Sequence, residues 1–175
     1  MTENLEIRES VPGDLAGIES LYPEAFPDED LLPLVRDLLW DAPVALSLVG
    51  IIDSRLVGHG ILTKCRVVGS RTKAALLGPL AVAPAWQKQG IGRAIVRAGL
   101  KRLEDAGVSQ VYVLGDPAYY GRLGFQPESC VTPPYPLPAE WAGAWQSKSL
   151  GGGATPRPGK LSLPRPWLRP ALWAP

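Results

Sequence analysis

The sequence predicts a mixed α/β fold, and three observations support this prediction. An apolar run over residues 74–82 leads through a short loop into a helix that begins at glycine. Residues 5–11 alternate as a half-buried strand does. Residues 43–64 contain two apolar runs around a polar turn, which is typical of a hairpin. The chain has 175 residues, a length that suits one domain with a sizeable core.

The expected elements follow the order β-α-α-β-β-β-α-β-α. Pro12-Gly13-Asp14 turns the chain after the first strand and caps the first helix. The third helix has a wide apolar face, while Arg93, Arg97 and Lys101 recur on its other face. The first strand is expected over residues 5–11, the first helix from the turn at Pro12-Gly13-Asp14 through Leu21, and the second helix over about 31–40. The hairpin strands are expected over 43–52 and 56–64, around Asp53-Ser54-Arg55. The remaining elements are a fourth strand over 74–82, a third helix over 92–106, a fifth strand over 110–114 and a short helix over 119–123.

The fourth predicted strand contains Gly78-Pro79 in its middle, where proline removes a donor that a neighbouring strand needs. We expect a bulge that bends this strand away from its neighbour. The backbone groups of Leu80, Ala81 and Val82 would then lack strand partners and could pair with an extended ligand as an added strand does. The alternative is that Pro79 ends one edge strand and a second strand begins.

The loop before the third helix has the features of a phosphate site. Gly90 and Gly92 let backbone N–H groups approach an anion, and the helix that they open presents unpaired donors and its positive dipole end there. The P-loop pattern is absent, and a dinucleotide fingerprint would need a small residue where Ile95 stands. We therefore expect this loop to hold a diphosphate; the alternative is a plain turn.

Two motifs resemble those of the GNAT superfamily of N-acetyltransferases. Gln-x-x-Gly-x-Gly over Gln87–Gly92 is similar to the family's pyrophosphate loop, and Tyr-x-x-x-Gly-Phe over Tyr120–Phe125 is similar to the element that closes its cofactor site. The motifs and the element order match over about Leu5–Phe125. The resemblance implies a central, mostly antiparallel sheet that is splayed at its fourth strand and flanked by helices. It also implies acetyl-coenzyme A (acetyl-CoA) as co-substrate and no metal.

The resemblance further implies roles for individual residues. The phenol of Tyr120 would protonate the leaving thiolate, which suits a group of pKa about 10 that stays protonated at neutral pH. Its neighbour Tyr119 would only pack. The backbone N–H of Val82 would stabilise the oxygen on which negative charge develops. The residues expected to contact the cofactor are Leu80, Ala81, Val82, Gln87, Lys88, Gln89, Gly90, Ile91, Gly92 and Arg93.

The activity implied is that of an acyltransferase that moves an acetyl group from acetyl-CoA directly to an amine, without a cysteine nucleophile. The acceptor stays open between a small molecule, a peptide and a protein amine. Val113 stands where many family members have an asparagine that touches pantetheine. The fourth strand carries no glutamate to act as general base, so the base stays open between an ordered water and Glu24, Asp28, Glu29, Asp30, Asp116 and His59, the last more often a structural residue.

Two other functions rank lower. A non-catalytic sensor or regulatory module that binds acyl-CoA would be consistent with the missing glutamate. An interaction protein would use the tail to bind a peptide or another subunit and keep the fold only as a scaffold.

Composition restricts the partners and the compartment. The net charge of +1 provides no broad field for nucleic acid, and no apolar run is long enough to cross a membrane. Cys65 and Cys130 have neither metal-site spacing nor the number for a disulfide scaffold, and we interpret them as small hydrophobic residues. Residues 1–6 lack the character of an export signal, so we expect a cytoplasmic protein.

We expect a single domain over residues 1–175, in which residues 1–125 form the core with the acetyl-CoA site. Residues 126–175 are rich in proline and tryptophan and would form an extension that completes the sheet. The resemblance implies that this extension borders the acceptor pocket; the alternative is that it only packs over the sheet edge. Their aromatic side chains carry apolar area to bury, so the tail is not expected to be disordered. We expect a short helix over Ala139–Trp145 and the last strand over Lys160–Leu163. The same tryptophans would also allow a homodimer.

Overall fold

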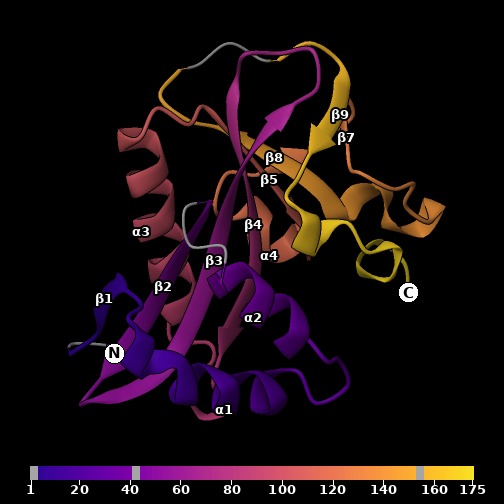
Figure 1. The fold of residues 1–175 in the computed structure, drawn as a ribbon. Coiled ribbons are helices and arrows are strands. Elements are labelled where there is room, and N and C mark those ends of the chain that lie inside the picture. Colours follow the sequence, from indigo (N-terminus) through magenta and orange to yellow (C-terminus); the bar gives the residue numbers. More distant parts are fainter. Residues whose placement is uncertain (1–3, 41–43, 153–155) are drawn as a thin grey trace. The chain divides into compact units, whose positions relative to one another are not determined.

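The strands and helices of the computed structural model form a mixed α/β fold with a mostly antiparallel open sheet (Figure 1). The structure describes residues 4–40, 44–152 and 156–175. The chain packs as two compact units, residues 1–62 with 78–101 and residues 63–77 with 102–175, and two long strands contribute to both. None of the helices in the described ranges has the length and apolar character needed to span a bilayer.

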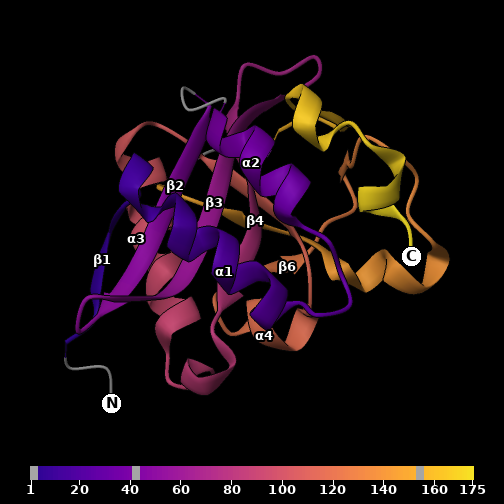
Figure 2. The ribbon, with the colours of Figure 1, turned by 60° about the horizontal axis from the view of Figure 1, so that its bottom comes forward.

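The first unit places helices on both faces of its strands (Figures 1 and 2). Its β2–β3 turn has Asp53 and Ser54 at φ 48° and 66°, the left-handed conformations of a tight hairpin turn. β1 pairs antiparallel with β2, with Glu6 opposite Ile51. The elements are β1 (Glu6–Glu9), α1 (Leu15–Ala25), α2 (Leu32–Trp40), β2 (Ala45–Ile52), the first part of β3 (Arg55–Val67), the second part of β4 (Lys73–Val82) and most of α3 (Ile91–Asp105).

Glycines allow α3 to pack directly on β3. A Cβ atom at Gly58 would lie 2.8 Å from Cδ1 of Ile95, and one at Gly60 would lie 3.0 Å from its Cγ2. A Cβ atom at Gly99 of α3 would lie 2.6 Å from Cδ1 of Leu62. Larger residues at these positions would push the helix off the sheet, because buried side chains have little room to shift. The glycines therefore determine how deeply α3 sits.

The second unit contains the end of β3, the start of β4 and strands from the C-terminal part of the chain. Residues Ala74–Leu77 of β4 pair in parallel with Gln110–Val113, β5 pairs antiparallel with β8, and β8 pairs with β6. β9 pairs antiparallel with the end of β3 and in parallel with β7. The strands are β5 (Gln110–Leu114), β6 (Gln126–Pro127), β7 (Val131–Thr132), β8 (Trp145–Ser149) and β9 (Gly159–Ser162), and the helix α4 spans Pro117–Gly121.

An aromatic cluster fixes the tail within the second unit. Trp145 stacks on Tyr112 of β5 with ring centroids 5.7 Å apart, and Trp173 packs edge-on against Trp145. The indole N–H of Trp173 donates to the carbonyl of Trp167 at 3.0 Å, and that of Trp167 donates to Thr63 Oγ1 at 3.1 Å. All three tryptophans are buried, as the expectation of an ordered tail requires.

The bounds of most elements agree with the sequence predictions, and the differences have local causes. Asp14 does not cap α1 with its side chain; its carboxylate accepts from the N–H of Val11 and pairs with Arg8. α1 continues past Leu21 to Ala25. The short helix begins at Pro117 because Asp116 caps it there. The expected helix over Ala139–Trp145 is a 3-10 helix over Ala139–Ala144, the last expected strand lies at Gly159–Ser162, and strands β6, β7 and β8 were not predicted.

We expect the substitution Gly58→Val to lower the free energy of unfolding by about 1–3 kcal/mol, because the new methyl groups would overlap the side chain of Ile95. Urea denaturation followed by circular dichroism measures the change. Gly13→Val is the control, since a Cβ atom at Gly13 would meet nothing within 4 Å. Equal midpoints for the two variants would show that the helix is not seated on the glycines.

Candidate active site

The second half of β4 leads into the loop that precedes α3. β4 runs without a break from Lys73 to Val82, so Pro79 does not end the strand and the alternative of two separate strands is wrong. The pairing with β5 covers Ala74–Leu77 and stops before Gly78. The parallel ladder thus ends where the glycine-proline pair predicts, and the strand continues to Val82.

The side chain of Gln87 ties the loop to the end of β4. Its Nε2 donates to the carbonyl of Val82 at 3.0 Å. Lys88 and Gly90 both adopt left-handed conformations, with φ of 63° and 85°. A Cβ atom at Gly90 would meet nothing within 4 Å, so the space beside this exposed backbone is open to a ligand.

The first turn of α3 presents main-chain donors that lack acceptors. Its first hydrogen bond runs from the N–H of Ala94 to the carbonyl of Gly90, at 3.0 Å. Within the described ranges, the N–H groups of Ile91, Gly92 and Arg93 find no acceptor in the protein. Free donors together with the positive end of a helix dipole favour the binding of an anion such as phosphate.

Two cationic side chains accompany these donors. Lys88 precedes them in the loop, and Arg93 belongs to the first turn of α3. Both are exposed, and neither takes part in the ion pairs found among the described residues. A diphosphate at this position would therefore meet positive charge as well as N–H groups.

Tyr120 belongs to the second unit, where its aromatic ring is held by neighbours on two sides. It packs edge-on against Phe125, with centroids 5.7 Å apart, and against Tyr119, with centroids 4.9 Å apart. Its Cε2 fills the space that a side chain at Gly115 would need. Gly115, which lies just before α4, is therefore required for this position of the Tyr120 ring.

The hydroxyl group of Tyr120 is suited to donate a proton. Burial raises the pKa of this phenol above its usual value of 10.0, and the nearby groups of Tyr119 and Asp116 raise it further. The phenol is therefore protonated at neutral pH. In the part of the chain that the structure describes, the hydroxyl has no hydrogen-bond partner, which leaves its proton free for a ligand.

His59 lies inside the first unit with both ring nitrogens engaged. Nδ1 lies 2.7 Å from the hydroxyl of Tyr22, and Nε2 lies 2.8 Å from Ser47 Oγ. The residue is 0% exposed, and burial lowers the pKa of its imidazole to about 4, against a smaller opposing effect of Asp14. A neutral, enclosed ring with two partners fits a structural role better than that of a general base.

The acidic candidates for a general base are either on the surface or occupied. Glu24 of α1 and the segment Asp28–Asp30 after it are exposed. Asp116 caps α4, because its Oδ1 accepts from the N–H of Ala118 at 2.9 Å. None of these carboxylates is linked by a hydrogen bond to β4, the loop or Tyr120 in the described ranges.

The structure also shows the surroundings of the possible metal ligands and of the two cysteines. The described residues contain no group of three or more His, Cys, Asp or Glu side chains that could hold a metal ion. Cys65 is buried, and burial raises the pKa of its thiol to about 12, which makes it a poor nucleophile. Cys130 is exposed, so it does not pack in the core as we would expect of a small hydrophobic residue.

Sequence reasoning missed a cavity of about 700 Å³ in the first unit. Its walls come from the end of β1, from α1 and α2 and from the start of β2, four segments that no single motif connects. It includes Ser10 and Ser47, which extend the hydrogen bonds of His59. The one signal in the sequence is Trp40, which ends a helix and is 89% exposed.

Comparisons with known proteins show which family this chain resembles in sequence and fold. Residues 15–125 match the acetyltransferase (GNAT) family. An uncharacterized N-acetyltransferase, YjhQ of Escherichia coli K12, is 35% identical over 78% of this chain and 80% of its own length. The crystal structure of the GNAT family N-acetyltransferase YhbS from Escherichia coli in complex with CoA has a TM-score of 0.83 at 29% identity, over 95% of this chain and 93% of that one. A GNAT family acetyltransferase from Brucella melitensis in complex with acetyl-CoA has a TM-score of 0.74 at 27% identity, over 93% and 97% of the two chains.

The buried imidazole predicts how stability depends on pH. His59 is the only histidine, with a pKa of about 4 in the folded chain and 6.5 as a reference. The unfolded chain then binds more protons between these values, so the free energy of unfolding falls as pH falls from 6.5 toward 4, by up to about 3 kcal/mol. The pKa of Asp14, lowered by Arg8, acts below 3.8 and so outside most of this window.

Urea denaturation of the wild type and of His59→Gln at pH 7, 6 and 5 measures this dependence. The variant should be less stable at pH 7, because the hydrogen bonds of His59 to Tyr22 and Ser47 are disturbed. Its stability should change less with pH, because glutamine does not titrate. Parallel pH profiles for the two proteins would contradict the prediction.

Proposed function

The chain belongs to the GNAT family of acetyltransferases, and on this premise we propose that it transfers an acetyl group from acetyl-CoA directly to the nitrogen of an amine. The observation that carries the proposal is the set of free N–H groups at Ile91, Gly92 and Arg93, beside an open backbone at Gly90. Such a set is suited to accept the diphosphate of CoA.

The loop and the end of β4 suit a ligand that is anionic at one end and amide-like along its length. The diphosphate would accept from the first turn of α3, with Lys88 and Arg93 adding charge. The pantetheine arm carries amides and would run along Leu80–Val82, beyond the point where the ladder with β5 stops. The hydrogen bond from Gln87 to Val82 holds the loop and the strand end in a fixed relation, which reduces the entropy lost on binding.

The chemical step needs a stabilised oxygen and a proton for the leaving group. As the amine nitrogen forms its bond to the carbonyl carbon, negative charge develops on the carbonyl oxygen, and we assign the N–H of Val82 to it. When the carbon–sulfur bond breaks, the phenol of Tyr120 donates a proton to the thiolate. The amine proton leaves to a base, which we assign to an ordered water or to one of the exposed carboxylates of Glu24, Asp28, Glu29, Asp30 and Asp116.

One observation favours a second candidate function. Residues Leu80–Val82 carry no carboxylate, and His59 is enclosed with both nitrogens engaged. A chain that binds acyl-CoA and lacks a positioned base would act as a sensor or regulatory module. Turnover with any amine distinguishes the enzyme from the sensor.

The phosphate assignment predicts a charge-specific loss of affinity at Gly90. Gly90→Asp should weaken CoA binding by at least about 10-fold relative to Gly90→Asn, because only the aspartate adds a negative charge at the first turn of α3. Asparagine tolerates the left-handed conformation, so this pair isolates the charge from the backbone strain. Isothermal titration calorimetry with CoA gives both affinities.

Gly107→Asp is the control for this comparison. Gly107 has φ of 87°, close to the 85° of Gly90, but lies beyond the other end of α3. Its substitution should leave the affinity for CoA unchanged. Equal affinities of the Asp and Asn variants at Gly90 would contradict a diphosphate at this loop.

The acid assignment predicts a separation of turnover from binding at Tyr120. With acetyl-CoA and a panel of amines, thiol release should slow by about 10²-fold or more in Tyr120→Phe, while the Kd for CoA changes little. Tyr119→Phe, which removes the neighbouring exposed hydroxyl, should retain the wild-type rate. Wild-type turnover in Tyr120→Phe would refute the acid role, and CoA binding without turnover on any amine would favour the sensor.

A further inference from the structure

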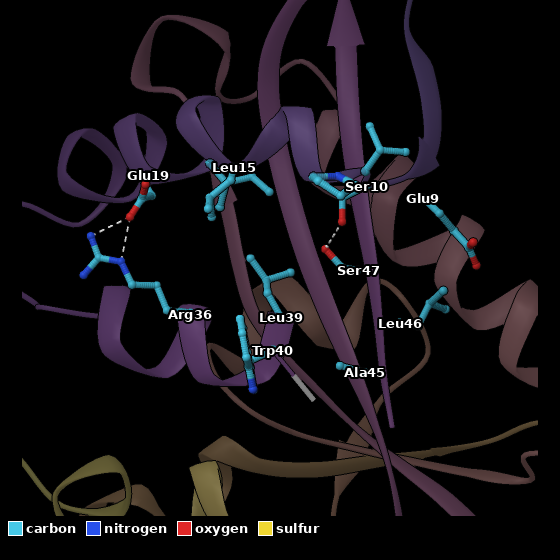
Figure 3. Close-up of a pocket in the computed structure, with 13 residues that line it drawn as sticks. Glu9, Ser10, Leu15, Glu19, Arg36, Leu39, Trp40, Ala45, Leu46 and Ser47 are labelled. Carbon is cyan, nitrogen blue, oxygen red and sulfur yellow. Dashed lines mark hydrogen bonds and ion pairs between the residues drawn. The ribbon is translucent and has the colours of Figure 1, made fainter. Parts of the chain in front are cut away.

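The cavity of about 700 Å³ in the first unit is lined mainly by apolar side chains (Figure 3). Leu15 of α1, Leu39 and Trp40 of α2 and Leu46 of β2 contribute to its walls. None of its lining residues belongs to β4, to the loop before α3 or to α4, so it is separate from the residues assigned to acetyl transfer. Its volume lies within the range of about 300–1,000 Å³ that is usual for sites of small molecules.

Exposed apolar side chains gather at this cavity. Val11, Leu15 and Trp40 all line it and are 55%, 41% and 89% exposed. They are three of the six large hydrophobic residues that are exposed in the described ranges. Single exposed residues of this kind need no explanation, but a cluster around a hollow is typical of a binding site. A concave surface of this size favours a small molecule over the flatter contact of a second protein.

A series of hydrogen bonds runs from the core to the wall of this cavity, the first buried and the next two half-buried. Tyr22 and Ser47 occupy the two ring nitrogens of His59, and Ser10 Oγ lies 2.7 Å from Ser47 Oγ. Ser10 and Ser47 line the cavity, and Figure 3 shows their hydroxyl groups turned toward each other. The chain therefore connects an enclosed imidazole with two hydroxyls at the cavity wall.

The protons of this chain can be assigned by counting donors and acceptors. The neutral ring of His59 has one N–H and one acceptor nitrogen. In the part of the chain that is described, the hydroxyl of Tyr22 has no acceptor other than Nδ1, and leaving it unpaired in the core would cost about 1–3 kcal/mol. Tyr22 therefore donates to Nδ1, and the ring carries its proton on Nε2 and donates to Ser47 Oγ.

This assignment leaves one donor to spare. The Nε2–H group and the hydroxyls of Ser10 and Ser47 supply three protons, but only two hydrogen bonds link these three groups. Whichever serine donates to the other, one hydroxyl proton finds no acceptor among the described residues. Because both serines line the cavity, the spare donor is available to a molecule inside it.

The charges around the cavity do not call for a charged ligand. Glu19 and Arg36 line it and form an ion pair at 2.6 Å, so their charges compensate each other. Glu9 is exposed, and its carboxylate points away from the other labelled side chains in Figure 3. A charged molecule would lose hydration in this apolar site without gaining a partner.

We propose that this cavity binds a small, neutral, mainly apolar molecule whose carbonyl or similar oxygen accepts the spare hydroxyl proton of the Ser10–Ser47 pair. Its apolar body would lie between Leu15, Leu39 and Trp40. This site is additional to the acetyl-transfer site and does not depend on that assignment.

Two neutral fluorescent probes test the proposal. Prodan (6-propionyl-2-dimethylaminonaphthalene) has a naphthalene body and a ketone oxygen, whereas N-phenyl-1-naphthylamine has a similar body without a carbonyl. Both should bind the wild-type chain with 1:1 stoichiometry and a blue-shifted emission. Ser10→Ala/Ser47→Ala should weaken Prodan about 3- to 10-fold and leave the affinity for N-phenyl-1-naphthylamine unchanged, which also shows that the cavity is intact.

A second variant tests the location without changing the hydrogen-bonded chain. Ala45→Trp places an indole ring in the cavity, where it competes with the probes for space, and should abolish the binding of both. Val68→Ala is the control, because Val68 is 60% exposed but belongs to the second unit, and it should bind both probes as the wild type does.

Three results would overturn the proposal: no saturable binding of Prodan to the wild type, binding that survives Ala45→Trp, or equal weakening of both probes in the serine variant. A dimer in sedimentation velocity that is lost in Trp40→Glu would also overturn it and would assign this face to a second copy of the chain.

Discussion

The first unit depends on the close packing of α3 against β3, at the two positions where β3 has glycine. Gly58 and Gly60 remove the atoms that would keep Ile95 away from β3, and Ile91 in the first turn lies against the same face, 3.1 Å from where a Cβ of Gly58 would be. The beginning of α3 is thereby fixed against β3. A helix N-terminus binds an anion well only if its N–H groups keep their positions, because reorganisation would cost affinity. The glycines of β3 would thus contribute to the proposed binding of CoA without touching it.

The same stretch of β3 serves both faces of the sheet. Successive side chains point to opposite sides of a strand, so in Gly58-His59-Gly60 the glycines face α3 and the imidazole faces α1. On that side the core accepts a polar ring because Tyr22 and Ser47 satisfy both of its nitrogens. Gly58 and Gly60 therefore determine how closely α3 packs on β3, and His59 between them holds the hydrogen bonds on the side of α1. A substitution on either face would change the packing of the middle of β3.

Local signals predicted much of the fold. The bounds of β5 at Gln110–Leu114 agree with the prediction, and α3 at Ile91–Asp105 differs by one residue at each end, because apolar periodicity and glycine punctuation are properties of short segments. β8 was not predicted because Trp145–Ser149 is mostly polar. Its position beside β5 depends on pairs of residues that are more than thirty positions apart in the sequence. The loop at Gln87–Gly90 lies between β4 and α3, and Tyr120 lies in the short helix α4, in the order that the sequence predicted. The residues that line the cavity come from four segments that no sequence motif connects. The roles within acetyl transfer stay predictions.

A lone imidazole has a practical value beyond its part in the core. Because His59 is the only histidine, its ring nitrogens give an NMR signature free of overlap from any other residue of this type. Its Nε2 contacts the hydroxyl of Ser47, which lines the cavity beside α1 and α2. The ring is fully buried, so exchange of its N–H proton with solvent is slowed. Selective nitrogen-15 labelling of this residue would thus provide a built-in sensor for screening compound libraries, with no dye attached and no substitution made.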